Sequence, residues 1–302
     1  MIEIKNVKKS FGDIEAVKEL SAEIREGQVY GLVGTNGAGK STLLRMISGV
    51  YAPDAGDILI DGESVFENPH AKEKICFIAD TGYFFPNATP KSMGEYFRAV
   101  YPAFDEGRYK KMLENAGLPA GRKIRTFSKG MKRQVSVLLG VCANTKYLLC
   151  DETFDGLDPV MRQAVKSVFA AEMLDRDFTP VIASHNMREL EDICDHVGLL
   201  HGGKILFSEN LEDMKFHMQK VQCVIPDKEK EAELVKNLDV IRETHQGSLM
   251  TLLVRGTNVD VLETVAEKDP VFAEALPLTL EEIFISETSL AGYEVGRLFG
   301  ED

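Results

Sequence analysis

The sequence predicts an α/β protein with a mostly parallel sheet, followed by a small α+β domain. Short apolar segments bounded by glycine alternate with amphipathic stretches up to about residue 210, as is typical of a buried parallel sheet covered by helices. The net charge of −13 is uneven, because residues 211–302 hold 9 basic against 19 acidic residues. This shift in composition predicts two domains, 1–210 and 211–302.

Strands and helices are expected to alternate along the first domain. Apolar runs predict strands at 1–7, 28–33, 57–60, 74–79, 147–150, 180–183 and 196–200. Helical periodicity predicts helices at 40–48, 92–101, 106–116, 129–143, 160–175 and 187–195. Turns at Asp61-Gly62 and Gly202-Gly203 predict antiparallel hairpins, so an antiparallel β subdomain is expected beside the parallel sheet.

The second domain shows a different order of elements. Its pattern predicts a strand at 220–224, a helix at 227–237, strands at 239–243 and 249–254, and helices at 259–268 and 279–287. Thr279 is followed by Glu282, a capping pattern that marks the start of the last helix. The acidic surplus is a poor match for a phosphate backbone, so no nucleic-acid partner is expected. A solvated surface that aids solubility is the simpler interpretation of it.

Composition narrows the class of protein further. Apolar residues make up 44% of the 302 residues and charged residues 27%, which is typical of a soluble globular chain. The five dispersed cysteines indicate reduced thiols in a cytosolic protein. The N-terminus alternates apolar and charged residues, so a first strand is expected there and no signal peptide. The longest apolar run, 135–143, is too short to span a membrane, so a membrane role would need another chain.

A glycine-rich segment fits the phosphate-loop pattern G-x-x-x-x-G-K-[ST] between a predicted strand and a predicted helix. The loop consists of Gly34, Thr35, Asn36, Gly37, Ala38, Gly39, Lys40, Ser41 and Thr42. Glycines let the backbone curl so that N–H groups face the phosphates, and the helix N-terminus favours the anion. Lys40 would reach the β- and γ-phosphates of ATP, and Ser41 would place its hydroxyl on Mg²⁺. The alternative is a glycine-rich turn before an ordinary helix.

Two carboxylates follow the apolar strand predicted at 147–150. Asp151 and Glu152 would lie at the carboxyl edge of the sheet, where ligands bind in open α/β sheets. Asp151 would hold Mg²⁺ directly or through water, and Glu152 would orient or activate the attacking water. Alone, the pair could be a surface turn at a strand end. Beside a phosphate loop, it favours nucleotide hydrolysis.

With these motifs, residues 1–210 resemble the nucleotide-binding subunits of ABC transporters. The family signature LSGGQ is similar to the segment 127–131, Phe-Ser-Lys-Gly-Met, which precedes Lys132-Arg133-Gln134. The resemblance implies a P-loop NTPase core with a helical signature subdomain. It also implies that two such domains stack head to tail, so that Ser128 and Gly130 of one copy close over the ATP of the other. Ser128 would also act as an ordinary helix N-cap.

Three further segments support the same resemblance. Gly156-Leu157-Asp158-Pro159 resembles the D-loop, and the family places Asp158 at the dimer interface. His185 follows a predicted strand and resembles the switch histidine that contacts the γ-phosphate. Phe11 matches the aromatic residue that stacks on adenine. As single residues, His185 would more often be structural and Phe11 part of a core.

The sequence departs from the family pattern at three positions. Asp80 stands where the Q-loop normally has Gln. Its carboxylate could still contact Mg²⁺ through water, but it is shorter and charged, so the usual coupling to a membrane subunit is in question. Thr153 replaces the common proline after the catalytic glutamate, and Lys129 replaces a glycine of the signature. None of these departures removes a group that the chemistry strictly requires.

The resemblance implies an ATPase that uses ATP and Mg²⁺ and acts on a transported substrate. The implied partners are a second copy or a related ATPase subunit, and an integral membrane permease that could dock on the aromatic segment 81–85. That segment could instead be a packed loop. The acidic tail, with residues 279–284, resembles extensions of bacterial exporter ATPases, so export and a cytoplasmic, membrane-peripheral location are expected. The alternatives are a soluble ABC-type ATPase and a regulatory nucleotide-binding module.

Overall fold

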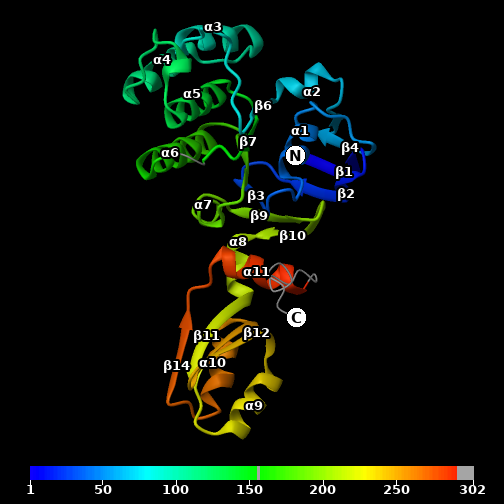
Figure 1. The fold of residues 1–302 in the computed structure, drawn as a ribbon, viewed down its shortest axis with the longest axis vertical. Helices are drawn as coiled ribbons and strands as arrows, with labels where there is room; N and C mark the ends of the chain where they lie inside the picture. The colour runs from blue at the N-terminus through cyan, green and yellow to red at the C-terminus, as the bar shows by residue number, and fades with distance from the viewer. Residues whose placement is uncertain (155–156, 291–302) are drawn as a thin grey trace. The chain divides into compact units, whose positions relative to one another are not determined.

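The computed structural model describes residues 1–154 and 157–290. The chain divides into two compact units, Met1–Ser208 and Glu209–Asp302. The first unit contains a six-stranded and a four-stranded sheet with flanking helices, and the second contains a four-stranded sheet with its own helices (Figure 1). These features confirm the predicted α/β class, the antiparallel subdomain and the α+β character of the second unit.

The central sheet of the first unit has the order β10-β9-β3-β8-β7-β6. Its strands are β3 (Tyr30–Gly34), β6 (Ile75–Ile78), β7 (Tyr147–Asp151), β8 (Thr179–Ser184), β9 (His196–His201) and β10 (Lys204–Asn210). Five of them, from β6 to β9, pair in parallel. Every residue of β3, β7 and β8 is buried, which explains why these strands are nearly continuous apolar runs. The carboxyl ends of β3, β7 and β8 therefore meet at one edge.

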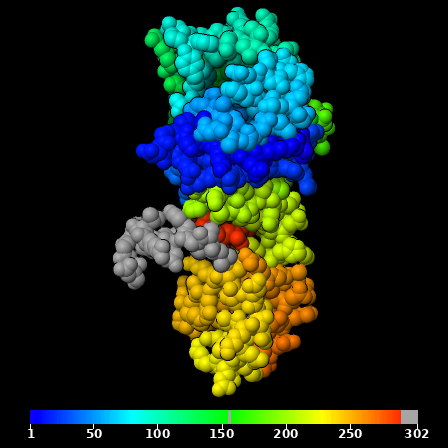
Figure 2. Space-filling view, turned by 90° about the vertical axis from the view of Figure 1, so that its right-hand side faces the viewer, coloured from blue at the N-terminus to red at the C-terminus, as the bar shows by residue number. Residues whose placement is uncertain are grey.

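An antiparallel sheet of order β2-β1-β4-β5 packs beside it. It consists of β1 (Ile2–Phe11), β2 (Ile14–Ile24), β4 (Ala55–Ile60) and β5 (Glu63–Ser64). Figure 2 shows the first two strands in dark blue lying against the light-blue segment that follows α1. Strand β2 is not predicted by the sequence pattern, because its Ala, Glu, Lys and Leu residues are good helix formers. Pairing with β1 along its length overrides that preference.

Seven α-helices complete the described part of the first unit. They are α1 (Lys40–Ile47), α2 (Pro69–Glu73), α3 (Pro90–Val100), α4 (Glu106–Asn115), α5 (Lys129–Cys142), α6 (Pro159–Asp175) and α7 (Met187–Glu191). Helices α3, α4 and α5 share a separate core around Tyr109 and Val135, which forms the predicted helical subdomain (Figure 1). Within the described ranges, none of the helices has both the length and the apolar character required to cross a bilayer.

The second unit folds as a β-α-β-β-α-β module of the split-βαβ type. Its elements are α8 (Leu211–His217), β11 (Met218–Val224), α9 (Lys228–Asn237), β12 (Asp239–Gln246), β13 (Leu249–Arg255), α10 (Asn258–Ala266), β14 (Phe272–Leu276) and α11 (Leu280–Leu290). The sheet order is β12-β13-β11-β14, with antiparallel pairing throughout. Its apolar face packs around Leu234, Val261 and Val265. The predicted cap is confirmed, since Thr279 and Glu282 exchange hydrogen bonds at the start of α11.

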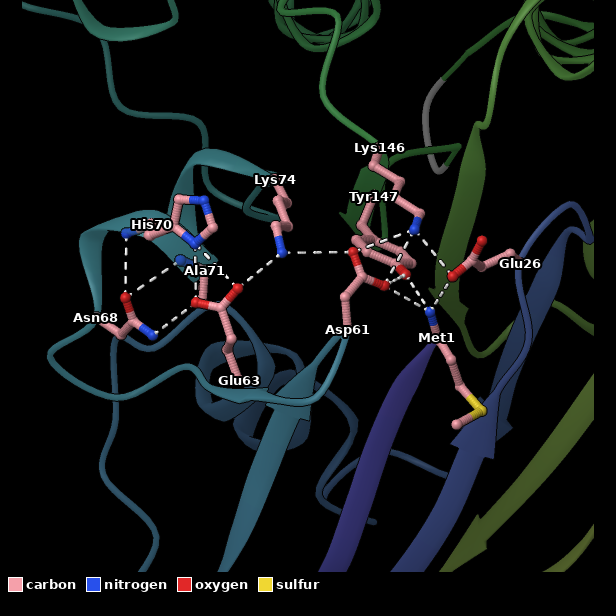
Figure 3. Close-up of polar contacts among 10 residues, drawn as sticks. All are labelled: Met1, Glu26, Asp61, Glu63, Asn68, His70, Ala71, Lys74, Lys146 and Tyr147. Carbon is pink, nitrogen blue, oxygen red and sulfur yellow. Dashed lines mark hydrogen bonds and ion pairs between the residues drawn. The ribbon is translucent and has the colours of Figure 1, made fainter.

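A polar network ties the antiparallel sheet to the amino end of β7 (Figure 3). Asp61 accepts hydrogen bonds from the Met1 amine at 2.7 Å, from the Tyr147 hydroxyl at 2.6 Å and from Lys146 at 3.0 Å. Burial alone would raise the pKa of Asp61, but these three donors lower it well below its usual range. Tyr147 begins β7 and Asp151 ends it, so the network lies at the sheet edge opposite the predicted carboxylate site.

Candidate active site

The phosphate loop lies between β3 and α1, where the backbone is too crowded for side chains at two glycines. A Cβ on Gly34 would lie 2.3 Å from the carbonyl oxygen of Leu200. A Cβ on Gly39 would lie 2.4 Å from the carbonyl oxygen of Ala16, and Gly39 has φ +108°. Gly37, with φ +80°, also adopts a left-handed conformation. The strands β9 and β2 therefore hold the loop in a curled shape that only glycine permits.

Lys40 points back into this curl. Its Nζ donates to the carbonyl oxygens of Gly34 at 2.7 Å and Thr35 at 3.2 Å, and it lies 3.6 Å from Oε1 of Glu152. The side chain is 6% exposed. Burial lowers the pKa of Lys40, and the nearby carboxylates of Glu152 and Asp151 partly offset this. A buried ammonium group in a ring of backbone groups is a site for an anionic ligand.

Ser41 and Asp151 meet at the start of α1 and the end of β7. The Ser41 hydroxyl donates to Oδ1 of Asp151 at 2.9 Å. The other carboxylate oxygen, Oδ2, is buried and has no hydrogen-bond partner among the described residues. Burial raises the pKa of Asp151. A hydroxyl beside a buried carboxylate with a free oxygen fits a hard divalent cation such as Mg²⁺, which prefers oxygen ligands.

Glu152 and His185 are brought together from the ends of β7 and β8. Oε2 of Glu152 lies 2.8 Å from Nδ1 of His185 and accepts a longer hydrogen bond, 3.4 Å, from the His185 backbone N–H. Glu152 has a left-handed φ of +48°, uncommon for a residue with a Cβ. Its backbone N–H donates to the carbonyl oxygen of Ala183 at 2.9 Å. This turn aims the carboxylate at both Lys40 and His185.

The carboxylate of Asp80 is paired with a protein side chain in this structure. Asp80 follows β6, and Oδ1 accepts a hydrogen bond of 2.9 Å from Arg133 of α5. Arg133 also donates to the backbone carbonyl oxygens of Asp80 at 2.6 Å and Ala79 at 3.3 Å. Asp80 thus has a protein cation as its partner in this structure. Arg133 stands beside the signature-like segment in the sequence, but no motif there assigns it a role.

The remaining candidates lie apart from the loop contacts. Ser128 is the N-cap of α5 and accepts from the Met131 N–H at 3.2 Å, which confirms the predicted cap. Asp158 caps α6, while Gly156, in the D-loop segment, lies outside the described residues. Phe11 is exposed and packs edge-to-face on Tyr51 with 5.4 Å between ring centroids. Ser128, Gly130 and Asp158 are therefore available at the surface of the chain or near it.

The side chains that converge at the loop stand in recognisable motifs, whereas the residues that support them do not. Arg45 of α1 lies close enough to Asp151 to lower its pKa against the effect of burial. The Ala16 carbonyl excludes a side chain at Gly39, and it belongs to the unpredicted strand β2. No motif in the chain marks these two residues, because their roles arise from packing between distant segments. The position of Arg133 next to the signature-like segment was the only hint in the sequence that it supports the site.

Comparisons with known proteins identify the family. A sequence profile described as ABC transporter matches residues 17–155. The linearmycin resistance ATP-binding protein LnrL of Bacillus subtilis is 32% identical over 213 residues, 68% of each chain. The ABC transporter ATP-binding protein YtrB of the same organism is 29% identical over 287 residues, 95% of this chain and 98% of YtrB. The methionine import ATP-binding protein MetN of Clostridium acetobutylicum is 28% identical over 276 residues, 86% of each.

The chain belongs to the ATP-binding proteins of ABC transporters, and it is an ATPase of that type. The fold agrees: the structure of an ATP-binding subunit of an ABC transporter superimposes with a TM-score of 0.65, at 23% identity, over 71% of this chain and 92% of that one. A dimeric bacterial ABC transporter cassette superimposes with a TM-score of 0.63, also at 23% identity, over 70% of this chain and 99% of that one. The YtrB alignment covers 95% of this chain, so it extends through most of the second unit.

Proposed function

We propose that this chain hydrolyses ATP with Mg²⁺ to power export of a substrate through a separate membrane subunit. The observation that carries the proposal is the convergence of Lys40, Glu152 and His185 beside the Ser41–Asp151 pair at one sheet edge. This set supplies an anion site, an oxygen pair for a cation and a carboxylate with a positioned partner. The proposal takes residues 1–210 as the ATP-binding domain and 211–302 as a second domain, supported by the division after Ser208.

Phosphoryl transfer to water requires mainly positioning and charge neutralisation. In the proposal, Lys40 and the loop N–H groups hold the β- and γ-phosphates of ATP. Mg²⁺, when bound, neutralises charge that develops on the phosphate oxygens. Ser41 and Asp151 are the residues that would hold it. Glu152 orients the attacking water and accepts its proton, and His185 fixes the Glu152 carboxylate through their 2.8 Å hydrogen bond.

The site requires a second copy in this proposal. Ser128, Gly130 and Asp158 do not belong to the group that converges on the loop, and Ser128 begins a 14-residue helix, α5. The N-terminus of such a helix attracts an anion because its N–H groups and dipole face outward. In the proposed dimer, Ser128 and Gly130 of one copy face the γ-phosphate held by the other. The dimeric cassette that shares the fold supports this arrangement.

An exposed aromatic cluster is the proposed docking face for the membrane subunit. Tyr83 is 75% exposed, Phe85 42% and Tyr96 45%, and their rings contact in sequence at centroid distances of 5.7 and 4.9 Å. Contiguous exposed aromatic rings are typical of protein interfaces. Phe84 instead packs against the helical core. The segment therefore combines a buried anchor with an exposed face, and docking there would place the chain at the cytoplasmic side of the membrane.

Export is supported by LnrL, whose name connects it to resistance against linearmycin. The MetN relative is named for import, so direction is part of the proposal. Co-purification of the tagged chain with a membrane permease, and loss of that permease in a Tyr83→Ala/Phe85→Ala variant, would test the docking face. Retention of the permease by this double variant would place the docking surface elsewhere.

ATP turnover by the Glu152→Gln variant tests the catalytic assignment. The variant keeps the size and the hydrogen-bonding oxygen of the side chain but removes its charge. We expect its turnover to fall by about 100-fold or more, as is typical for loss of a general base. ATP binding should persist, because Lys40 and the loop are untouched. Glu229→Gln, in the first turn of α9, is the matched control. Wild-type turnover no higher than that of Glu152→Gln would refute the assignment.

A further inference from the structure

The contact between Asp80 and Arg133 joins two parts of the first unit that are far apart in the sequence. Asp80 follows the last residues of β6, in the central sheet, and Arg133 lies in the second turn of α5, in the helical subdomain. Two hydrogen bonds connect them, from Nη1 to the Asp80 carbonyl oxygen and from Nη2 to the Asp80 carboxylate, and Nη1 also donates to the carbonyl oxygen of Ala79. The Arg133 guanidinium therefore binds both backbone carbonyl oxygens and the Asp80 side chain just after β6.

The burial of the two partners is very unequal. The Arg133 side chain is 4% exposed, whereas that of Asp80 is 51% exposed. A buried guanidinium group requires a counter-charge, because an unpaired buried cation is strongly destabilising. Asp80 supplies that charge at 2.9 Å. A neutral glutamine, the usual family residue, could accept a hydrogen bond but could not neutralise the cation. Arg133 thus gives a physical reason for the aspartate at this position.

The pair also lies between the two halves of the proposed catalytic machinery. Ser128 caps α5, and Arg133 lies five residues further on, within about one and a half turns of the same helix. Asp80 is close enough to Asp151 that its negative charge adds to the effect of burial in raising the Asp151 pKa. The same helix, α5, therefore contacts the strand end next to Asp151 through Arg133 and carries the N-terminus that would face the partner's nucleotide.

We propose that Asp80 and Arg133 form a latch that positions the N-terminus of α5 for closure over the nucleotide bound by the second copy. Asp80 is then a positioning residue and not a metal ligand. The inference rests on the proposed function, since it requires ATP-dependent pairing of two copies. The proposal explains why aspartate replaces the family's glutamine at position 80: the aspartate makes a contact within one chain, between the central sheet and α5.

The proposed latch should affect dimer closure without affecting nucleotide binding by a single chain. In the proposed function the loop, Ser41 and Asp151 hold ATP and Mg²⁺, whereas the hydrogen bonds of Arg133 go to Ala79 and Asp80, so ATP binding to a single chain should not depend on the latch. Closure of the dimer should depend on it, because a loosened α5 presents Ser128 and Gly130 less accurately. A residue that ligates the metal would show the opposite pattern, with weaker Mg²⁺ binding before any dimer forms.

The test uses the full chain carrying Glu152→Gln, so that closed dimers persist. Asp80→Asn and Arg133→Lys are introduced singly, and Asp80→Asn/Arg133→Gln as a pair. Glu106→Gln, which removes the exposed Arg98–Glu106 ion pair on α3 and α4, is the control. ATP binding is measured by nucleotide fluorescence at a protein concentration below that of dimerisation, and dimerisation by light scattering against ATP concentration. The Mg²⁺ requirement is measured by titration of the same samples.

We expect Asp80→Asn and Arg133→Lys to raise the ATP concentration for half-maximal dimerisation by about fivefold, the size of effect that follows from losing one charge-assisted contact. Monomer affinity for ATP should change by less than about twofold in both variants, and monomer affinity for Mg²⁺ by less than about twofold in Arg133→Lys, which leaves the charge of Asp80 near Asp151 in place. The paired variant should be no worse than the worse single variant, because partners in one contact are not additive. The control should behave as the parent chain.

Two results would overturn the latch while leaving the proposed function intact. One is normal dimerisation of Asp80→Asn with a raised Mg²⁺ requirement, which would make Asp80 a metal ligand. The other is dimerisation of both single variants at the parent's ATP concentration. If the parent chain binds ATP without dimerising at any concentration, the proposed two-copy site fails and the latch fails with it. The parent's behaviour therefore separates the two failures.

Discussion

Replacing Asp151 with asparagine should stabilise the nucleotide-free chain and remove its response to Mg²⁺ and ATP. The wild-type carboxylate is buried, and its Oδ2 has no hydrogen-bond partner among the described residues. An unsatisfied buried polar atom costs about 1–3 kcal/mol, and more when it is charged. Asparagine keeps the acceptor for Ser41 and removes the charge, although its amide nitrogen remains unpaired. The net gain should be about 1 kcal/mol, or about 2–4 °C in the unfolding midpoint.

The pH dependence follows from the direction of the Asp151 pKa. Burial raises it, so the folded state favours the protonated carboxyl more than the unfolded state does. That contribution to stability is fully present below the unfolded pKa of about 4 and is lost as pH rises through the folded pKa. The advantage of Asp151→Asn over wild type should therefore be absent below about pH 4, grow as pH rises, and level off once pH exceeds the raised pKa of the folded carboxyl.

Thermal unfolding at neutral and acidic pH, with and without Mg²⁺-ATP, measures both parts of this prediction. Wild type should gain stability on adding Mg²⁺-ATP, since a ligand that binds only the folded state stabilises it. Asp151→Asn should gain little. Ser41→Ala is the companion variant: it frees Oδ1 as well, so it should lower stability without ligand. A less stable Asp151→Asn protein at neutral pH without ligand would show that the carboxylate is satisfied and would refute the reasoning.

Two further predictions concern the loop and the polar network. Gly39→Ala should weaken ATP binding by about tenfold or more, because its Cβ would lie 2.4 Å from a backbone carbonyl at φ +108°. Gly37→Ala, where no atom lies within 4 Å of the added Cβ, should cost less, and equal losses in a binding titration would contradict the crowding argument. Asp61→Asn should lower the free energy of unfolding at pH 7 by about 1–2 kcal/mol, since three donors surround that carboxylate. Because the pKa of Asp61 is lowered, this stability is present above about pH 4 and lost as pH falls, so denaturant melts of the two proteins should converge in acid; a constant gap would exclude Asp61 as the source.

Local sequence patterns predicted most of the fold, because the burial of a strand or helix determines which of its residues are apolar. Strands β3, β7 and β8 are apolar throughout since both faces are covered. Strand β2 was missed because its residues favour a helix and only pairing with β1 makes it a strand. Strand β14 was missed for a related reason: three of its five residues are exposed, so it shows little apolar pattern. Helix α7 is shorter than predicted and ends at Glu191.

The candidate site likewise combines residues that the sequence predicts with contacts that only the structure shows. Lys40, Ser41, Asp151 and Glu152 stand in contiguous motifs, where the spacing itself requires a strand, a loop and a helix. The contact between His185 and Glu152 depends on β7 and β8 being neighbours, which the order of motifs suggested and the strand register establishes. The partner of Asp80 could not be predicted, because Arg133 reaches it across more than fifty residues of intervening chain.

The sequence by itself determined the phosphate loop, the paired carboxylates, the family and the change in character near residue 210. These features are local, and the physical requirements for binding a phosphate act on neighbouring residues. Only the tertiary structure decided what surrounds each group: the carbonyl that excludes a side chain at Gly39, the unsatisfied oxygen of Asp151 and the cation that holds Asp80. Burial and pairing between distant segments set those environments, and they depend on how the sheets and helices pack.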